Sequence, residues 1–461
     1  MLSEQQVKEL LYQRFIEPTK VQRPLCVGIE LELPIVNLAG EPVDFLVVHD
    51  LTQRFKQHFG FAVDHLDDEG NVFSLVCPQT GDILSYDCSY NNLEFSFGKV
   101  VGLHEVQRRF ARYCAFAQET LAQQQHTLTG MGINPHRGIN RQVPIPVERY
   151  RMLCHHLQAA PRIMPPRPYH PYPDYGMFSS ASQVQIDVEH DKLLPTLRAF
   201  GALEPLKALL FSNSPLSDGG IDYLCARDML WEASSQGYNP RNVGLFDPVP
   251  ASIDALVDYL ATTSIYCTER GTRYLNFRPL PIVEFFATPR ISGEYFEDGA
   301  YHTTTIEPQA SDLLYLRTYK FEDITFRGTI EFRSVCCQPI RDTMSTAAFH
   351  VGLMQQVERL NELLDANDVL YQRGHSPAEL RKLLVQRRLP DFVDSEKTVA
   401  LLLNILHLAE DGLRQRGLDE ESFLQPLFER AQKLEPPALR MLRQRESGTP
   451  LNQIIRQYAK L

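Results

Sequence analysis

Four segments of the sequence have the alternation of a strand with one apolar face and one face of long polar side chains. In VGIELELP, residues 27–34, apolar residues at alternate positions enclose Glu30 and Glu32. The pattern returns in NNLEFSF (91–97), SQVQIDV (182–188) and TIEFRS (329–334). The polar faces of these three segments include acids, amides and one arginine: Glu94, Gln183, Gln185, Glu331 and Arg333.

This composition indicates metal and phosphate chemistry. An ordinary solvated face, the alternative for any single strand, would be expected to mix in Lys and Thr, whereas these faces carry the ligands of hard divalent cations and phosphate. Crowded carboxylates would repel one another and raise their pKa values unless cations neutralised them, which favours bound Mg²⁺ or Mn²⁺. Arg333 could then offer its planar fork to a transferring phosphoryl group.

Carboxylates that hold metals, together with an arginine on the phosphate, are typical of an ATP-using enzyme without a glycine-rich phosphate loop. The sequence contains no G-x-x-x-x-G-K-[ST], and no G-x-G-x-x-G opens a helix. It also has no Ser-His-Asp order that would support a hydrolase.

Composition excludes several other classes of function. The 461 residues are 43% hydrophobic, enough for a sizeable core, and their 46 basic and 57 acidic residues leave a net charge of −11 spread along the chain. Broad binding to a nucleic-acid backbone is therefore not expected. The first 15 residues have the pattern of an amphipathic helix, not of a signal peptide, and no apolar run approaches the roughly 20 residues that span a bilayer. Nine scattered cysteines favour buried thiols in a reducing cytoplasm.

The spacing of apolar residues and turn residues predicts an α+β fold with an antiparallel sheet. We expect one catalytic core, residues 1–345, and a helical carboxyl-terminal part, residues 346–461, packed on it. The expected elements are strands through 27–98, a helix at 101–125, an irregular loop at 144–173, a strand at 182–189, a helix at 191–211 broken near Pro195 and Pro205, a helix at 253–267, strands at 316–335 and amphipathic helices beyond 345.

The order of the motifs from about residue 25 to residue 355 resembles the glutamate–cysteine ligase family, in particular its plant and bacterial branch. The similar segments are GIELE, NNLEFSFG, GMGINPH, YGMFSSASQVQIDV, LLFSNSP, ARDMLWEASSQGYNPRNVGLF and GTIEFRSVCCQP. Each motif is short, and together they occur in the family's order.

The resemblance implies the fold shared by glutamine synthetase and the guanidino kinases, a funnel of curved antiparallel strands lined by metal ligands and surrounded by helices. It also implies a reaction in which ATP phosphorylates the γ-carboxylate of L-glutamate and an amine such as that of L-cysteine displaces the phosphate, the first step of glutathione biosynthesis. The implied cofactors are ATP and Mg²⁺ or Mn²⁺, and the partners are these small molecules, with no nucleic acid, no membrane and the oligomeric state open.

Carried over residue by residue, the resemblance assigns roles to the polar faces and to three residues outside them. The implied metal ligands are Glu30, Glu32, Glu94, Glu331 and Gln185, with Gln183 as polar support near ATP. Arg333 steadies the phosphoryl group beside Glu331, Arg241 is a candidate for nucleotide phosphate, Arg227 meets the glutamate carboxylate, and Trp231 walls that pocket. A surface ion pair is the alternative for Arg227 and Arg241, and core packing is the alternative for Trp231.

Departures from the family's pattern leave the amine acceptor open. SVCC follows Arg333 where the family commonly has a small residue and an Asp, and Tyr169, His170 and Pro171 replace its Tyr-Met-Pro loop. A ligase with another acceptor and a catalytically silent relative that binds nucleotide or amino acid therefore remain alternatives. A metal-dependent phosphoesterase, which typically adds His and Asp ligands, fits this mainly glutamate set less well.

Overall fold

The computed structural model describes residues 1–163, 169–367 and 374–461. Within them, one large sheet contains nine strands. They are β1 (Val27–Asn37), β2 (Ala62–Leu66), β3 (Val72–Val76), β4 (Ile83–Tyr86), β5 (Asn92–Val100), β6 (His126–Leu128), β7 (Ser182–Asp187), β16 (Glu322–Ile324) and β17 (Thr329–Phe332). Their order is β16-β17-β7-β1-β5-β4-β3-β2, with β6 paired to β1 beside this path, and every pairing is antiparallel. The α+β class with an antiparallel sheet is therefore confirmed.

Three helices cover the apolar face of this sheet: α3 (Leu103–Ala122), α5 (Leu193–Phe211) and α9 (Met344–Met354). Phe95 of β5 packs on Phe110 of α3 with ring centroids 6.0 Å apart. Phe332 of β17 packs on Phe200 of α5 at 4.5 Å. Because side chains alternate along a strand, burial of this face turns the acids and amides of the same strands to the other side of the sheet.

The sequence had suggested strands throughout residues 27–98, but part of this range is helical. A helix, α2 (Phe45–Phe59), lies between β1 and β2 and packs on α3 and β3. Asp44 caps its first turn, Gly60 ends it in the left-handed conformation at φ 70°, and Val48, Leu51 and Phe55 are buried at helical spacing. The spacing of three and four residues between Val48, Leu51 and Phe55 is that of a helix, but the β-branched pair Val47 and Val48 obscures it in the sequence.

Two further predictions from proline were wrong. The stretch 144–173 contains α4 (Glu148–Ile163) instead of an irregular loop throughout, and its residues 164–168 lie outside the described part. α5 runs unbroken through Pro195 and Pro205. Pro195 stands in the first turn, where backbone N–H groups have no helical acceptor, and Pro205 is held by a helix buried on nearly all sides.

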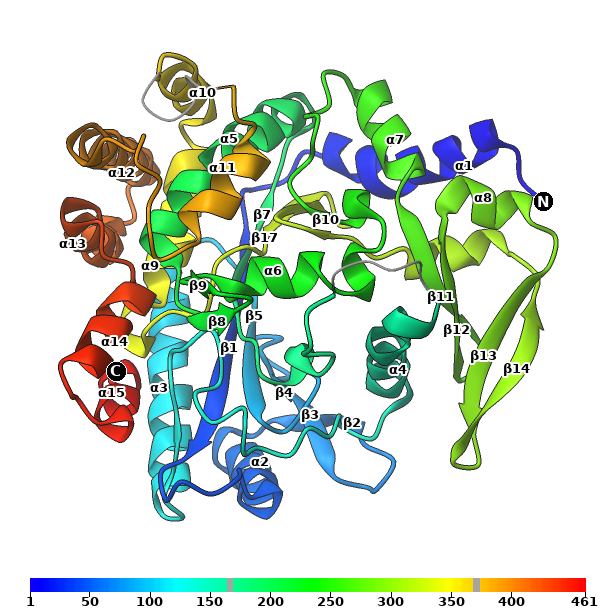
Figure 1. The fold of residues 1–461 in the computed structure, drawn as a ribbon, viewed down its shortest axis with the longest axis horizontal. Helices are drawn as coiled ribbons and strands as arrows, with labels where there is room; N and C mark the ends of the chain where they lie inside the picture. Colours follow the sequence, from blue (N-terminus) through cyan, green and yellow to red (C-terminus); the bar gives the residue numbers. More distant parts are fainter. Residues whose placement is uncertain (164–168, 368–373) are drawn as a thin grey trace.

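A second sheet lies on the side of the large sheet opposite to the carboxyl-terminal helices (Figure 1). Its strands, in spatial order, are β11 (Ser264–Arg270), β12 (Arg273–Pro281), β13 (Ile291–Glu297) and β14 (Ala300–Ile306). α4 packs against β12, and α1 (Glu4–Leu11), the expected amphipathic helix, packs against α7 (Ile253–Ala261) and α8 (Ile282–Ala287). The expected helix 253–267 thus ends early, because residues from Ser264 onward enter β11.

Short elements connect these layers. Two small sheets pair β8 (Leu216–Asp218) with β9 (Ile221–Tyr223) and, in parallel, β10 (Val243–Gly244) with β15 (Tyr319–Lys320). α6 (Ala226–Glu232) lies in front of the large sheet in Figure 1. The described part of the chain also contains a short π-helix, Tyr12–Ile16, and short 3₁₀ helices at Glu17–Lys20, Tyr175–Met177, His190–Lys192, Ser235–Gly237, Pro240–Asn242, Ala310–Tyr315, Ile340–Asp342 and Glu421–Leu424.

The described residues beyond 345 are mainly helical, as expected. The helices after α9 are α10 (Val357–Asp365), α11 (Pro377–Leu384), α12 (Ser395–Arg416), α13 (Gln425–Lys433), α14 (Pro437–Glu446) and α15 (Leu451–Tyr458). Helices α10 to α13 form an outer layer over α5 and α9, and α14 and α15 lie beside α3 (Figure 1). A domain boundary near residue 345 stays a prediction. In the described part of the chain, no helix combines the length and apolar composition that crossing a membrane requires.

Two glycines let α9 and α12 approach closely. A Cβ atom added to Gly412 of α12 would lie 1.9 Å from the carbonyl oxygen of Gly352 in α9, and one added to Gly352 would lie 2.3 Å from the carbonyl oxygen of Ala409. Both contacts are with backbone atoms, which a side-chain rotation cannot relieve. The outer helical layer therefore requires glycine here for its packing distance.

Gly412→Ala should destabilise the protein, although alanine usually stabilises an exposed helix relative to glycine by roughly 0.5–1 kcal/mol. Overpacking against the Gly352 carbonyl should lower the free energy of unfolding by about 1–3 kcal/mol. Urea unfolding followed by circular dichroism measures the change. Gln415→Ala, on the exposed side of the same helix, is the control and should have little effect. A Gly412→Ala protein as stable as the parent would contradict this packing.

Candidate active site

Register across four strands brings the predicted carboxylates and amides together. Glu32 stands directly opposite Glu94, and Glu30 stands opposite Gln183. On the far side of β7, Glu331 stands opposite Gln185. The side chains come from residues up to 300 apart in sequence, and only the antiparallel pairing of β5, β1, β7 and β17 makes them neighbours.

The two glutamines hold two of the glutamates in place. Gln183 Nε2 donates to Glu32 Oε1 at 2.9 Å, and the Ala181 backbone N–H donates to Glu32 Oε2 at 2.7 Å. Gln185 Nε2 donates to Glu30 Oε1 at 3.2 Å. Both oxygens of Glu32 are thus engaged, and Glu32 is only 6% exposed. This geometry makes Glu32 the glutamate of the cluster with the least freedom to bind a ligand.

Arg333 lies beside Glu331 at the end of β17, with 3.4 Å between Nη1 of the arginine and Oε2 of the glutamate. Burial opposes the charge of Arg333, but the charges of Glu331, Asp323 and Glu30 outweigh it and raise the pKa of the guanidinium. Arg333 Nε is buried and has no hydrogen-bond partner in the described part of the chain. The fork therefore retains a donor for a ligand.

The pKa values of three carboxyl groups are raised. Burial, together with the charges of Glu331 and Glu94, raises the pKa of Glu30 well above its ordinary value. Burial and the charge of Asp87 raise the pKa of Glu32 to about 8 and that of Glu94 to about 7. Near neutral pH Glu32 and Glu94 are therefore partly protonated, and a bound cation would displace those protons.

The sequence analysis missed two carboxylates of this cluster. Asp87, which follows β4, exerts the largest charge effect on both Glu32 and Glu94. Asp323 stands opposite Glu331 on β16, accepts a hydrogen bond from Thr318 Oγ1, and has a pKa raised to about 6 by burial. An acid at the turn of the hairpin that carries Glu94 could have indicated Asp87. The position of Asp323 beside Glu331 depends on the pairing of β16 with β17, which the sequence did not predict.

Arg227 and Trp231 lie on α6, against the segment that follows β17. Arg227 Nη1 lies 3.5, 3.4 and 3.3 Å from the carbonyl oxygens of Arg333, Ser334 and Val335. The Trp231 ring centroid lies 4.9 Å from the Cζ of Arg227 and 5.8 Å from that of Arg333. Because Arg227 is only 4% exposed, its alternative role as half of a surface ion pair is wrong. Both residues therefore face the polar side of the large sheet next to Arg333.

Arg241 is not brought into this group by any contact that the structure describes. It lies in the short helix Pro240–Asn242 with its guanidinium 4.7 Å from the ring centroid of Tyr259. Its backbone N–H donates to Asn239. A role at the nucleotide phosphate stays a prediction for this residue.

A magnesium ion shared with a nucleotide fits the donor set better than a closed protein cage. Glu30, Glu94 and Glu331 each have one carboxylate oxygen that accepts no hydrogen bond from the described residues. Gln183 Oε1 and Arg227 Nε are buried without partners there. In the same residues, no three acidic, His or Cys side chains are arranged to hold a metal as they stand. Mg²⁺ usually takes one or two protein carboxylates and completes its shell with water and phosphate oxygens.

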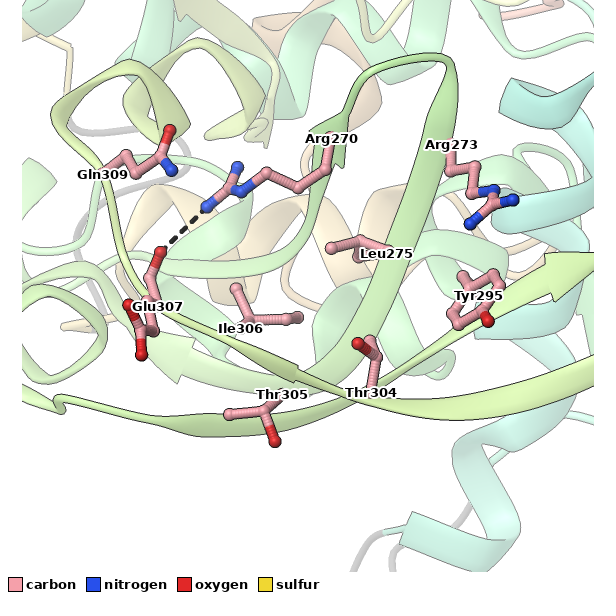
Figure 2. Close-up of a pocket in the computed structure, with 9 residues that line it drawn as sticks. All are labelled: Arg270, Arg273, Leu275, Tyr295, Thr304, Thr305, Ile306, Glu307 and Gln309. Atoms are coloured by element: carbon pink, nitrogen blue, oxygen red, sulfur yellow. Dashed lines mark hydrogen bonds between the residues drawn. The ribbon is translucent and has the colours of Figure 1, made fainter.

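A pocket of about 420 Å³ on the second sheet lies apart from the acidic cluster of the large sheet (Figure 2). It is lined by Arg270, Arg273, Tyr295 and Glu307, among others, and by none of the predicted site residues within the described part of the chain. Arg270 donates to the Glu307 carbonyl at 3.0 Å and to Asp312 Oδ2 at 2.9 Å. These contacts neutralise the cation, so the pocket lacks the chemistry that the acidic cluster offers.

Comparison with known proteins identifies similar chains. The family model for glutamate-cysteine ligase family 2 matches residues 26–457, a range that contains every predicted site residue. The chloroplastic glutamate–cysteine ligase of Arabidopsis thaliana is 26% identical over 273 residues, which are 56% of this chain and 48% of that protein. The glutamate–cysteine ligase A of Oryza sativa subsp. indica is 22% identical over 398 residues, 83% of this chain and 73% of that protein. The chain spans about half the length of several curated relatives that it matches.

Similar solved structures include two from bacteria. The glutamate–cysteine ligase of Francisella tularensis in complex with AMP has a TM-score of 0.47 and 12% identity, with 95% of this chain and 89% of that chain covered. The bifunctional glutathione synthetase of Pasteurella multocida has a TM-score of 0.44 and 13% identity, with 99% of this chain and 52% of that chain covered.

Replacing one crowded carboxylate by its amide should stabilise the ligand-free protein at high pH. The pKa of Glu94 is about 7 in the folded protein against 4.5 for an unperturbed glutamate. As pH rises between these values the unfolded state loses its proton first, so the folded state loses relative stability, and the full penalty applies above pH 7. Glu94→Gln should therefore raise the free energy of unfolding by on the order of 2 kcal/mol at pH 8 and little at pH 5.

Urea unfolding at the two pH values measures this difference. Glu119→Gln, an exposed glutamate of α3, is the matched control and should change stability little at either pH. A Glu94→Gln protein no more stable than the parent at pH 8 would show that the carboxylate carries no such penalty.

Proposed function

The chain belongs to glutamate–cysteine ligase family 2, and from this premise we propose that it is an ATP-dependent carboxylate–amine ligase that forms a γ-glutamyl amide. One observation carries the proposal: strand register gathers Glu30, Glu94 and Glu331 on one sheet face beside Arg333. This is the combination of anionic ligands and a phosphate-binding fork that phosphoryl transfer requires. No residue has to act as a covalent nucleophile.

In the proposed reaction, an oxygen of the glutamate γ-carboxylate attacks the γ-phosphorus of ATP and ADP leaves. The amine nitrogen of the acceptor then attacks the acyl carbon, and phosphate leaves with that oxygen while the nitrogen loses a proton. Arg333, which keeps a buried donor without a partner among the described residues, neutralises the phosphoryl group as it moves. Its planar fork fits two phosphate oxygens at once.

The acidic side chains of the cluster contribute to the proposed reaction mainly through their negative charge, which would bind a metal ion. Glu30, Glu94 and Glu331 would hold Mg²⁺ or Mn²⁺, which would supply positive charge against the negative charge of the transferring phosphoryl group. Gln185 and Gln183 keep Glu30 and Glu32 oriented through the hydrogen bonds that they donate. Asp87, close enough to raise the pKa of Glu32 and Glu94, belongs to the same set.

We assign the glutamate substrate to the region where α6 meets the end of β17. Arg227 is already in contact with the backbone after Arg333 and keeps an Nε donor without a partner among the described residues. We assign this donor to the carboxylate of the substrate, with the face of Trp231 as the wall of the pocket. Both guanidinium groups contact the same indole ring, which supports a glutamate site next to the transferring phosphoryl group.

L-cysteine is the proposed acceptor, which would make the reaction the first step of glutathione biosynthesis. The names of the family and of the plant relatives support this choice. A different amine is the second candidate, because SVCC follows Arg333 where the family commonly has a small residue and an Asp. The described residues include all nine cysteines, each a free thiol, which supports a reducing compartment such as the cytoplasm.

ADP release in the presence of ATP, Mg²⁺ and L-glutamate tests the function, with each amine supplied in turn and L-cysteine first. We expect release that requires glutamate and is stimulated by cysteine. Stimulation by another amine alone would assign that acceptor instead, and no release with any amine would favour the silent relative.

Glu331→Gln should abolish turnover while thermal unfolding stays within a few degrees of the parent. Glu307→Gln, a 70% exposed glutamate of the remote pocket, is the matched control and should retain full activity. Near-normal ADP release by Glu331→Gln would remove this carboxylate from the proposed site.

A further inference from the structure

The carboxyl-terminal part contacts α6, the helix that carries Arg227 and Trp231, and the chain just before it. The end of α11 and the residues after it run along the chain before α6: the N–H groups of Leu224 and Cys225 donate to the Val385 carbonyl at 2.7 and 3.3 Å. The Arg387 N–H donates to the Asp222 carbonyl at 2.8 Å. Residues separated by some 160 positions thus form one continuous backbone contact. Figure 1 shows α11 beside α5 and close to α6.

Arg381 of α11 is the buried centre of this contact, with 3% of its surface exposed. Its Nε and Nη2 donate to the two oxygens of Asp228 at 2.6 and 3.2 Å. Its Nη1 donates to the backbone carbonyl of Glu204 at 2.8 Å and to the carboxylate of the same residue. One planar fork therefore joins α6 to α5. Asp228 directly follows Arg227 in the sequence, so the fork acts one residue from the proposed glutamate ligand.

Glu204 connects the same fork to the end of β17. Its Oε1 accepts hydrogen bonds from Ser334 Oγ at 2.9 Å and from Lys207. The carbonyl oxygen of Ser334 is one of those that contact Arg227. Arg381 is thus linked to both walls of the proposed glutamate pocket, to α6 through Asp228 and to the segment after Arg333 through Glu204.

The charges in this buried group balance. Burial alone would raise the pKa of Glu204, but the charges of Lys207 and Arg381 lower it to about 2. Burial and the charge of Glu204 raise the pKa of neighbouring Glu322 well above its ordinary value, which favours the uncharged form of that side chain. Two cations, Arg381 and Lys207, then meet two anions, Glu204 and Asp228. Removing one member leaves an uncompensated buried charge.

α6 depends on such external contacts for its position. It has only seven residues, and its N-cap residue, Cys225, makes no side-chain capping bond. Isolated helices of this length are not stable in water. Besides Arg381, Lys382 of α11 reaches α6 by an ion pair of 2.9 Å with Glu232. α11 therefore adds two ionic contacts to the apolar packing that holds α6 in place.

We propose that Arg381 is a positioning residue for the glutamate-binding side of the site, which holds Arg227 and Trp231 in place through Asp228. The helical carboxyl-terminal part thereby completes the site with a residue that touches no substrate. The identity of the ligand as glutamate rests on the proposed function. The positioning itself rests on the contacts described above.

Trp231, the only tryptophan of the chain, reports the position of α6 directly. In Arg381→Met we expect a shifted emission maximum and roughly twofold stronger quenching by acrylamide, because α6 loses its buried anchor. The KM for L-glutamate should rise at least about tenfold, while the KM for ATP changes less than about threefold. Trp231 fluorescence and a glutamate KM both unchanged would overturn the proposal.

Arg430→Met is the matched control. Arg430 of α13 is equally buried, at 2% exposure, and bridges Asp342, Gln338 and the Leu210 carbonyl without touching α6. The Arg430→Met protein should lose about as much free energy of unfolding as Arg381→Met, but it should keep the parental Trp231 emission and the parental KM for glutamate. If Arg430→Met altered both readouts as strongly as Arg381→Met, the effect would be general loosening and the proposal would fail.

Arg381→Lys keeps the experiment decisive where Arg381→Met does not fold. An ammonium retains the charge but cannot span Asp228 and Glu204 with a planar fork. We expect near-parental thermal unfolding, an altered Trp231 emission and a glutamate KM between those of the parent and Arg381→Met. A parent without ligase activity would refute the proposed function alone, since the fluorescence comparison needs no turnover. An active parent whose lysine variant matches it in both readouts would refute the positioning role alone.

Discussion

The structure depends on a crowding of negative charge that its own arginines do not cancel. On the polar face of the large sheet the carboxyl groups of Glu30, Glu32, Glu94, Asp87, Glu331 and Asp323 act on one another, and they outnumber the guanidinium groups that act on them. Like charges brought out of water are costly unless protons or cations neutralise them. The raised pKa values of Glu32 and Glu94 are the form that this cost takes without a ligand. A divalent cation bound with a polyphosphate would remove it.

A second buried group of charges, between α5, α6 and α11, is built on the opposite rule. Arg381 and Lys207 form ion pairs with Glu204 and Asp228, so these four charges balance within the protein. The contrast separates scaffold from site. The balanced group fixes the elements that carry Arg227 and Arg333. The unbalanced group leaves negative charge that a bound cation would neutralise. Both groups lie next to the same apolar layer, in which Phe95 and Phe332 of the large sheet pack against α3 and α5.

Strand alternation predicted more of the site than of the fold. It placed Glu30, Glu94, Glu331 and Arg333 on polar faces correctly, because period-two burial is a local property of each segment. It failed at α2, where helical spacing lies between strands, and at α5, where tertiary burial keeps a helix continuous through proline. Asp87, Asp323 and Arg381 were missed for another reason. Their partners are set by strand pairing and by helix packing across as many as 177 positions, which no local pattern contains.

The most direct test of the account is to locate a divalent cation in crystals grown with Mn²⁺ and a non-hydrolysable ATP analogue, by the anomalous scattering of manganese. The account predicts a peak on the polar face of the large sheet, with a carboxylate oxygen of Glu30, Glu94 or Glu331 within about 2.5 Å and phosphate oxygens completing the shell. Manganese bound only elsewhere, with these three side chains contacting nothing but protein and water, would contradict it.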